Sequence, residues 1–192
     1  MSVGVPWLSG PSDAARTWPT AATEVPAAAC SLGVPDGWGD GDRPVGPDGH
    51  GQGWTYQGTT PVDWLSVRHR LDPGAEGELS RWVDVTLRAL GFPVVPPSDL
   101  AFDLPRLAEW SDASTDADDR QRLGLDELRC HRGLATWESH RMRLYVVLAR
   151  RGDEAWLVTL SMETAAAPGM PAEVGADDDL RAGAVFGPLS LG

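Results

Sequence analysis

Hydrophobic and polar positions alternate most clearly over residues 142–163, in the segment MRLYVVLARRGDEAWLVTLSME. Alternate residues of a strand share one face of a sheet, so this pattern predicts two antiparallel strands joined by a tight turn at Gly152. A two-residue turn would place Leu144 opposite Ser161, whereas a three-residue turn would place Leu144 opposite Leu160. We expect the three-residue turn, because it gives the hairpin one uniformly apolar face.

The other face of the hairpin is predicted to be amphipathic. Its polar and aromatic positions are Arg141, Arg143, Tyr145, Thr159 and Ser161. The earlier segment VDWLSVRHRL alternates in the same way and predicts a strand over residues 62–71. That strand extends the amphipathic face with Trp64, Ser66, Arg68 and Arg70.

A helix is predicted over residues 73–90, directly after this strand. Asp72 suits an N-cap and Pro73 the first helical position, and Gly91 and Pro93 would end the helix. Its apolar side recurs at helical spacing through Leu79, Trp82, Val83, Thr86, Leu87 and Leu90. Such a stripe needs a sheet to cover it, and we expect the row formed by Leu65, Val67 and Leu71 to do so.

The remaining elements are less regular. Proline interrupts residues 93–110, which predicts a loop, and the acidic residues 111–122 predict a second, solvated loop. The segments DELRC and LATWES are expected to be strands on either side of a turn or bulge at Gly133. The C-terminal part predicts a short helix followed by an extended segment.

Residues 1–58 differ from residues 59–192 and are predicted to be an irregular N-terminal segment appended to one domain. They are rich in proline and glycine and contain Trp7, Trp18, Trp38 and Trp54, four of the nine tryptophans. So many tryptophans favour anchoring over a solvated linker. Either the segment wraps its own domain, which we favour, or a partner or second subunit orders it.

The charge of the chain limits its partners. A formal net charge of −12 argues against nucleic acid, which is bound largely by neutralising phosphates. No stretch reaches the roughly 18 apolar residues of a membrane span, and the first residues lack the features of a signal peptide. We therefore expect a cytoplasmic protein. Cys30 and Cys130 are expected to be separate structural thiols.

The order of elements is similar to that of a known superfamily. The segments LSVRHRLDPGAEGELSRWVDVTLRALGF, GLATW and RMRLYVVLARRGDEAWLVTLSMET resemble the PsbP-like superfamily, which includes actinobacterial Lpq lipoproteins and adaptor chaperones of type VI secretion. The resemblance covers about residues 60–190. It implies an α+β fold, in which a central antiparallel sheet is packed by helices as an α/β/α sandwich, and a binding or assembly role without catalytic residues.

No catalytic, metal or cofactor motif emerges from the sequence. His50, His69, His131 and His140 have no zinc-ligand spacing, either with one another or with Cys130. Paired carboxylates occur at residues 126–127 and 177–179, where a solvated face or a helix start explains them better than acid–base catalysis. We therefore predict no metal and no cofactor.

The favoured hypothesis is a non-catalytic protein-binding or assembly protein, such as an adaptor or chaperone in a secretion or other multi-protein apparatus. Arg and aromatic side chains are enriched at interfaces, which makes the amphipathic face and the N-terminal tryptophans the candidate partner-binding residues. These are Trp64, Arg68, Arg70, Arg141, Arg143, Tyr145, Trp7 and Trp18. The alternative is a small-ligand-binding protein or enzyme with a pocket between the sheet and the N-terminal tail. A purely structural explanation is that the amphipathic face is the solvent-exposed side of the domain or lies beneath the N-terminal tail.

Overall fold

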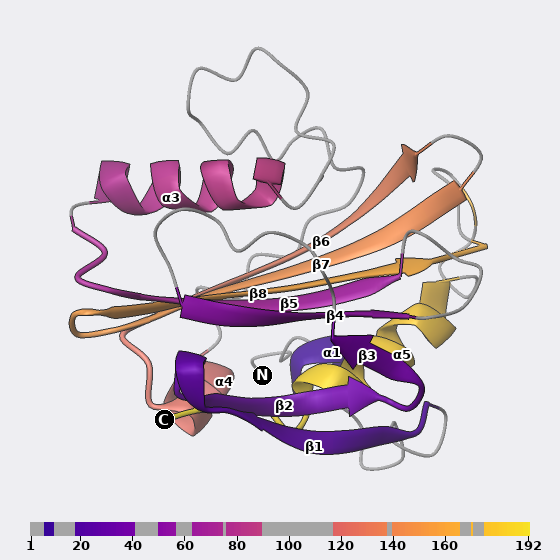
Figure 1. Cartoon of the computed structure of the whole chain (residues 1–192), viewed down its shortest axis with the longest axis horizontal. Helices are drawn as coiled ribbons and strands as arrows, with labels where there is room; N and C mark the ends of the chain where they lie inside the picture. Colours follow the sequence, from indigo (N-terminus) through magenta and orange to yellow (C-terminus); the bar gives the residue numbers. More distant parts are fainter. Residues whose placement is uncertain are drawn as a thin grey trace.

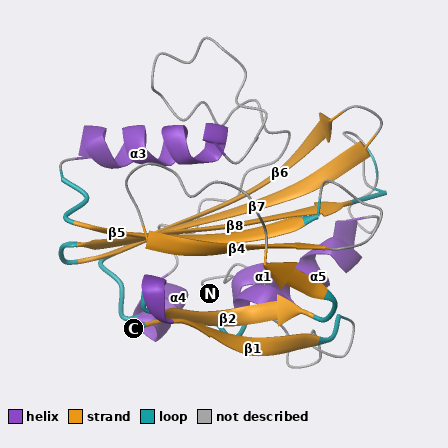
Figure 2. Cartoon of the chain, viewed as in Figure 1, coloured by secondary structure: helices purple, strands orange, loops and turns teal. Residues whose placement is uncertain are grey.

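The computed structural model describes residues 6–9, 18–40, 50–56, 63–74, 76–89, 117–137, 140–165, 170 and 175–192. These residues form two antiparallel sheets and several helices, so the predicted α+β class is confirmed (Figures 1 and 2). The larger sheet contains, in spatial order, β3 (Trp38–Asp40), β4 (His50–Tyr56), β5 (Trp64–Leu71), β8 (Glu154–Glu163), β7 (His140–Arg151) and β6 (Glu127–Trp137). The smaller sheet contains β1 (Thr20–Val25), β2 (Cys30–Pro35) and β9 (Ser190–Leu191).

The hairpin of β7 and β8 is present, but its predicted register is wrong. The last pair before the turn is Arg151 with Glu154, so the turn has two residues and Leu144 lies opposite Ser161. Gly152 takes a φ of 54° at the first turn position, where a type II′ turn favours glycine. The expectation of one uniformly apolar face could not select the register, because both faces of this hairpin are buried.

The N-terminal segment is not irregular in its described part. It supplies β1 and β2 of the smaller sheet and also β3 and β4, which extend the larger sheet beyond β5. The expectation that this segment wraps its own domain is confirmed, because Trp7 and Leu8 of α1 (Pro6–Ser9) are buried in the core. A separate appendage over residues 1–58, distinct from a domain over residues 59–192, stays a prediction.

The helices correct several boundaries. Helix α3 is Glu76–Ala89, so Asp72 is not its N-cap and Pro73 precedes the helix. Helix α4, Ala117–Leu123, occupies part of the predicted acidic loop, and the rest of that loop lies outside the described residues, as does the predicted loop at 93–110. Strand β6 runs through Gly133 without the predicted turn. Helix α5, Ala176–Phe186, and strand β9 confirm the predicted C-terminal elements.

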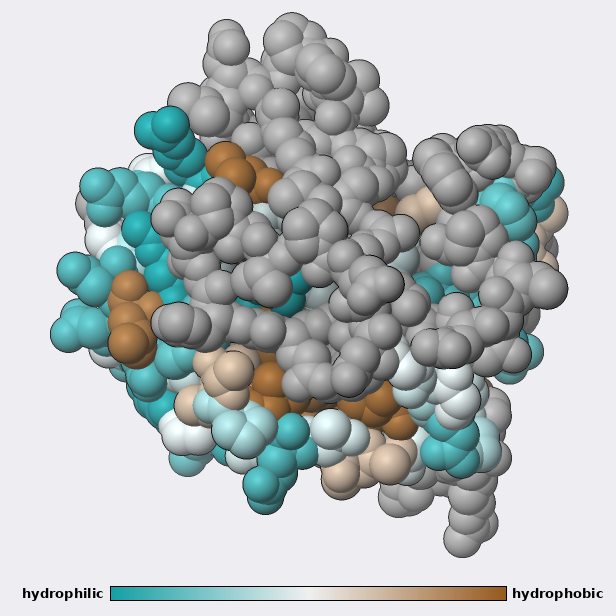
Figure 3. All heavy atoms as spheres, viewed as in Figure 1, coloured by the Kyte–Doolittle hydropathy of each residue, from teal (hydrophilic) through white to brown (hydrophobic). Residues whose placement is uncertain are grey.

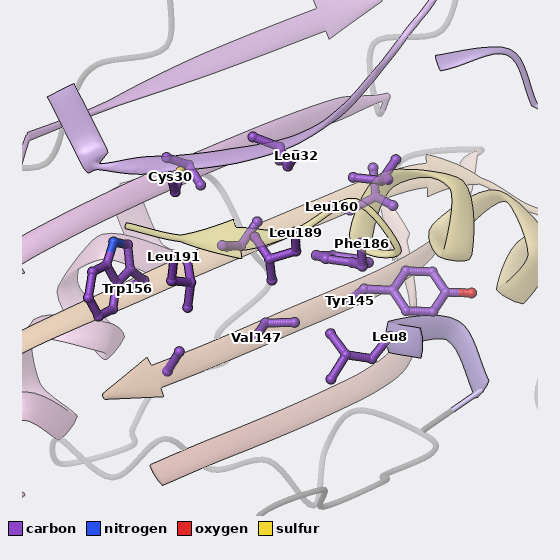
Figure 4. Packing of buried hydrophobic residues seen from close by; sticks show 14 of the residues in the cluster. Leu8, Cys30, Leu32, Tyr145, Val147, Trp156, Leu160, Phe186, Leu189 and Leu191 are labelled. Atoms are coloured by element: carbon purple, nitrogen blue, oxygen red, sulfur yellow. The ribbon is translucent and has the colours of Figure 1, made fainter. Parts of the chain in front are cut away.

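Two separate clusters of buried hydrophobic residues hold these elements together. The first lies between the sheets and includes Trp7, Tyr145, Trp156 and Phe186, with contributions from α1, α5 and β9 (Figure 4). The indole of Trp156 also donates a hydrogen bond of 2.8 Å to the carbonyl of Ala28, in the 3-10 helix η1 (Pro26–Ala28). This bond joins β8 to the N-terminal segment.

The second core lies on the opposite face of the larger sheet, where α3 packs (Figure 1). The helix contributes Leu79, Trp82 and Val83, and the sheet contributes Trp64, Met142, Leu144, Val146, Leu148, Ala155 and Leu157. The predicted partner row for α3 is therefore wrong. Leu65 and Val67 belong to the first core, and Leu71 is 63% exposed.

Candidate functional site

The predicted amphipathic face is divided between the two faces of the larger sheet. In the observed register Trp64 lies opposite Ser161, Ser66 lies opposite Thr159, and these residues share the α3 side of the sheet with Arg68. Arg143 and Tyr145 point to the other side, toward the smaller sheet, because Tyr145 lies opposite Leu160 rather than Thr159. A change of one residue in register moved half of the hairpin's side chains to the opposite face.

Three hydroxyl side chains form what we call the hydroxyl row, namely Ser66, Thr159 and Ser161. Ser66 is directly opposite Thr159 on the neighbouring strand, and Ser161 is two residues farther along β8. Their exposed fractions are 2%, 0% and 0%. None of the three oxygens has a hydrogen-bond partner among the residues that the structure describes. The row lies on the side of the sheet that carries α3.

Burial of the hydroxyl row reduces the stability of the folded chain. Burying a hydroxyl without a hydrogen bond costs about 1–3 kcal/mol, so each member of the hydroxyl row lowers the stability by an amount of this order. Burying the apolar side chains of Leu79, Trp82 and Val83 contributes about 1.5–3 kcal/mol each, and the apolar sheet residues of the second core add to this total. The seat of α3 on the sheet is therefore less favourable than a purely apolar interface of the same area.

Trp64 and Arg68 border the hydroxyl row on β5. Trp64 is 2% exposed and packs in the second core. Arg68 is 1% exposed, and its guanidinium donates a hydrogen bond of 3.0 Å to the carbonyl of Val67. Burial lowers the pKa of Arg68 below its usual value. Arg68 thus places a buried positive charge beside the hydroxyl row.

A second polar group, which we call the ionic cluster, joins the larger sheet to the start of α5. Its members are Arg132, Arg143, Tyr145, Thr164, Asp178 and Asp179. The hydroxyl of Tyr145 donates a hydrogen bond of 2.8 Å to Asp179, which also pairs with Arg132. Asp178 accepts a hydrogen bond from Thr164, and its carboxylate lies 3.7 Å from Nε of Arg143.

The ionic cluster explains the acidic start of α5. Asp178 and Asp179 lie in the first turn, where the helix dipole favours negative charge. Burial raises the pKa of the Asp178 carboxyl, although Thr164 and Arg143 oppose that shift. Burial, followed by the charge of Asp179, raises the pKa of Tyr145 well above its usual value. The prediction that these carboxylates mark a helix start is confirmed, and their contacts are those of a helix that docks on a sheet.

The other candidate residues lie apart from these two groups. The ring of Trp7 makes edge contacts with Tyr145 and Phe186, with centroid distances of 5.0 and 5.4 Å. Trp18 is half-buried and packs edge-on against Trp38. Arg70 is half-buried at the end of β5, and Arg141 is exposed, with a hydrogen bond of 3.4 Å to the carbonyl of Ala165.

The eight predicted partner-binding residues therefore do not form one open surface. Five of them, Trp7, Trp64, Arg68, Arg143 and Tyr145, are buried. The partners of Arg143 and Tyr145 were missed in the sequence, where nothing distinguishes Asp178 and Asp179 from an ordinary acidic helix start. The described surface in the view of Figure 3 is mostly hydrophilic, with separated apolar patches. Within the described ranges, no three His, Cys, Asp or Glu residues are grouped to hold a metal ion, and no helix is long and apolar enough to cross a membrane.

Known proteins share little sequence similarity with this chain. Neither a protein-family model nor a curated protein matches the sequence. Among solved structures, a Bacteroides thetaiotaomicron protein is similar with a TM-score of 0.44 and 8% identity, over 88% of this chain and 47% of the other. The Saccharomyces cerevisiae Ran-binding protein Mog1p is similar with a TM-score of 0.47 and 11% identity, over 91% and 96% of the two chains.

This chain spans about half the length of the Bacteroides protein. Both structural similarities are too distant to carry a functional conclusion. The resemblance of the sequence to PsbP-like proteins stays a prediction.

Proposed function

We propose that this chain is a non-catalytic protein-binding or assembly protein that binds its partner on the α3 side of the larger sheet. The hydroxyl row carries the proposal. Its three buried oxygens have no partner among the described residues, and a bound protein segment with polar side chains would supply the missing hydrogen bonds. Trp64 and Arg68, of the residue types enriched at interfaces, border the row.

An adaptor or chaperone role in a secretion or other multi-protein apparatus is the form of this function that the PsbP-like resemblance implies. We propose a cytoplasmic location and a protein partner rather than nucleic acid, since the chain carries a net charge of −12. The space between the sheet and the N-terminal strands holds the large side chains of Trp7, Tyr145 and Phe186. That filling favours a protein partner over the alternative of a small ligand between the sheet and the tail.

The proposal is tested with the double variant Thr159→Val and Ser161→Ala. Both changes remove buried hydroxyls that have no partner, so the variant should be at least as stable as the wild type and any loss of binding is not caused by unfolding. The tagged full chain is used to capture proteins from cells that express it, and each captured protein is purified and titrated by calorimetry. We expect the double variant to bind its partner at least tenfold more weakly.

A matched control carries Thr23→Val and Ser190→Ala, which remove hydroxyls from the smaller sheet, where Ser190 is exposed and Thr23 is half-buried. This control should bind like the wild type. Equal affinity of the wild type and the double variant would show that the hydroxyl row is not the binding site. A folded chain with no direct protein partner would contradict the proposed function itself.

A further inference from the structure

Helix α3 is connected to the sheet through a linker with unusual backbone angles. Asp72 has a φ of 51° and Gly74 a φ of 72°, both in the left-handed region. That region is uncommon and strained for a residue other than glycine. Both residues lie between the end of β5 and the start of α3, and hinge movements are absorbed at such positions between elements. The backbone N–H of Asp72 donates a hydrogen bond of 2.7 Å to the carbonyl of Asp153, which fixes the end of β5. A movement of α3 would therefore pivot beyond the fixed amide of Asp72, between Asp72 and Gly74.

The seat of α3 is separate from the core that joins the two sheets. The helix is anchored by Leu79, Trp82 and Val83, and none of the sheet residues that they meet belongs to the first core. Gly77, Glu78 and Arg81 on the helix are exposed. The helix can thus leave its seat without opening the interior between the sheets.

The seat is shaped for a helix but incompletely matched by α3. Its apolar part receives three side chains at the i, i+3 and i+4 spacing of a helical stripe, as in recognition of a helix by a groove. Its polar part, the hydroxyl row, has no hydrogen bond from α3 or from any other described residue. A helix with the same apolar stripe and added polar side chains would match both parts.

We infer that the seat of α3 is a helix-binding groove, and that an amphipathic helix of a partner protein displaces α3 from it. This inference rests on the proposed function and names the partner's chemistry. The partner helix carries large apolar side chains at i, i+3 and i+4, together with amide or hydroxyl side chains that face the hydroxyl row. Helix α3 acts as the resident occupant, so the apparent affinity for the partner depends on how often α3 leaves the groove.

Two linker variants shift that equilibrium in opposite directions. Gly74→Ala strains the closed linker, because alanine disfavours the positive φ and the added Cβ would meet the exposed side chain of Glu78, which would have to move. Asp72→Gly relieves strain at the other left-handed residue and favours the closed helix. The probe is a fluorescein-labelled synthetic peptide of residues 73–89, added to the full-length chain and followed by fluorescence anisotropy.

We expect the peptide to bind the Gly74→Ala chain about five- to tenfold more tightly than the Asp72→Gly chain, with the wild type between them. A peptide carrying Trp82→Ala should lose this binding. Hydrogen exchange of the α3 amides should be faster in Gly74→Ala and slower in Asp72→Gly, while exchange in β7 and β8 stays unchanged.

The inference is overturned if α3 exchanges only as slowly as β7 and β8 in every variant, or if peptide binding does not depend on Trp82 or on the linker. Failure of the proposed function gives a different result. In that case the peptide would bind as expected and α3 would open, yet no protein from the cell would bind the groove directly.

Discussion

Replacing Thr159 by valine should stabilise the protein, although it removes a polar group from the centre of the larger sheet. Thr159 is 0% exposed and lies opposite Ser66 and Val146 on the neighbouring strands. Valine has the same shape as threonine, so the packing is kept and only the hydroxyl without a partner is lost. The cost removed is about 1–3 kcal/mol. For a chain of this size, the midpoint of thermal unfolding should rise by roughly 2–12 °C.

Urea unfolding followed by tryptophan fluorescence measures this change, with the slope of the transition expected to stay constant. Thr164→Val is the matched control, because Thr164 is also buried but its hydroxyl donates a hydrogen bond to Asp178. The same substitution should therefore destabilise the protein by about 1–3 kcal/mol at position 164. If Thr159→Val lowers the unfolding free energy as much as Thr164→Val does, the hydroxyl of Thr159 has a partner and the proposed binding face loses its main support.

Three further predictions follow from the packing. Replacing Gly33 by alanine should destabilise the fold by about 1–3 kcal/mol, because the added Cβ would meet the backbone of α5. The same change at Gly77, which lies in open space on α3, should stabilise the fold by about 0.5–1 kcal/mol. Thermal unfolding of the two variants measures these opposite effects. Arg143→Leu should destabilise the fold by about 3–5 kcal/mol, because it removes the guanidinium 3.7 Å from the buried carboxylate of Asp178 and leaves only the smaller electrostatic effect of Arg181. Arg141→Ala, at an exposed position, should change the unfolding free energy by less than about 0.5 kcal/mol. Equal effects of the two changes in urea titration would contradict the ionic cluster. Burial raises the pKa of the Cys30 thiol from 9.0 to about 11, so the folded state holds this proton more tightly than the unfolded state does. The unfolding free energy should therefore fall as the pH rises from 9 to 11. The Cys30→Ala variant should show a smaller fall over the same pH range.

Much of the fold was determined by local patterns in the sequence. Alternation over residues 142–163 and 62–71 located β5, β7 and β8, because each strand buries alternate residues on one face or the other. The helical spacing of Leu79, Trp82 and Val83 located α3 and its buried side. These features depend on residues a few positions apart, which the sequence shows directly.

Only the tertiary structure decided which faces are covered and by what. Because the larger sheet is buried on both sides, its strands carry apolar residues on both faces, and apolar alternation could not choose between a two-residue and a three-residue turn. The one-residue difference in register then separated Arg143 and Tyr145 from the hydroxyl row.

The N-terminal strands and the ionic cluster depend on contacts far apart in the sequence. β2 pairs with β9, in which Cys30 lies opposite Leu191, and Asp179 reaches Tyr145 across 34 positions. Glycine-rich stretches have no strong local preference for a strand, so pairing with an existing sheet edge, rather than propensity, makes β4 a strand. The sequence by itself determined the elements and the residue types of the candidate site. Packing on both faces of the sheet decided that five of those residues are buried, and that the hydroxyl row lies on the side covered by α3.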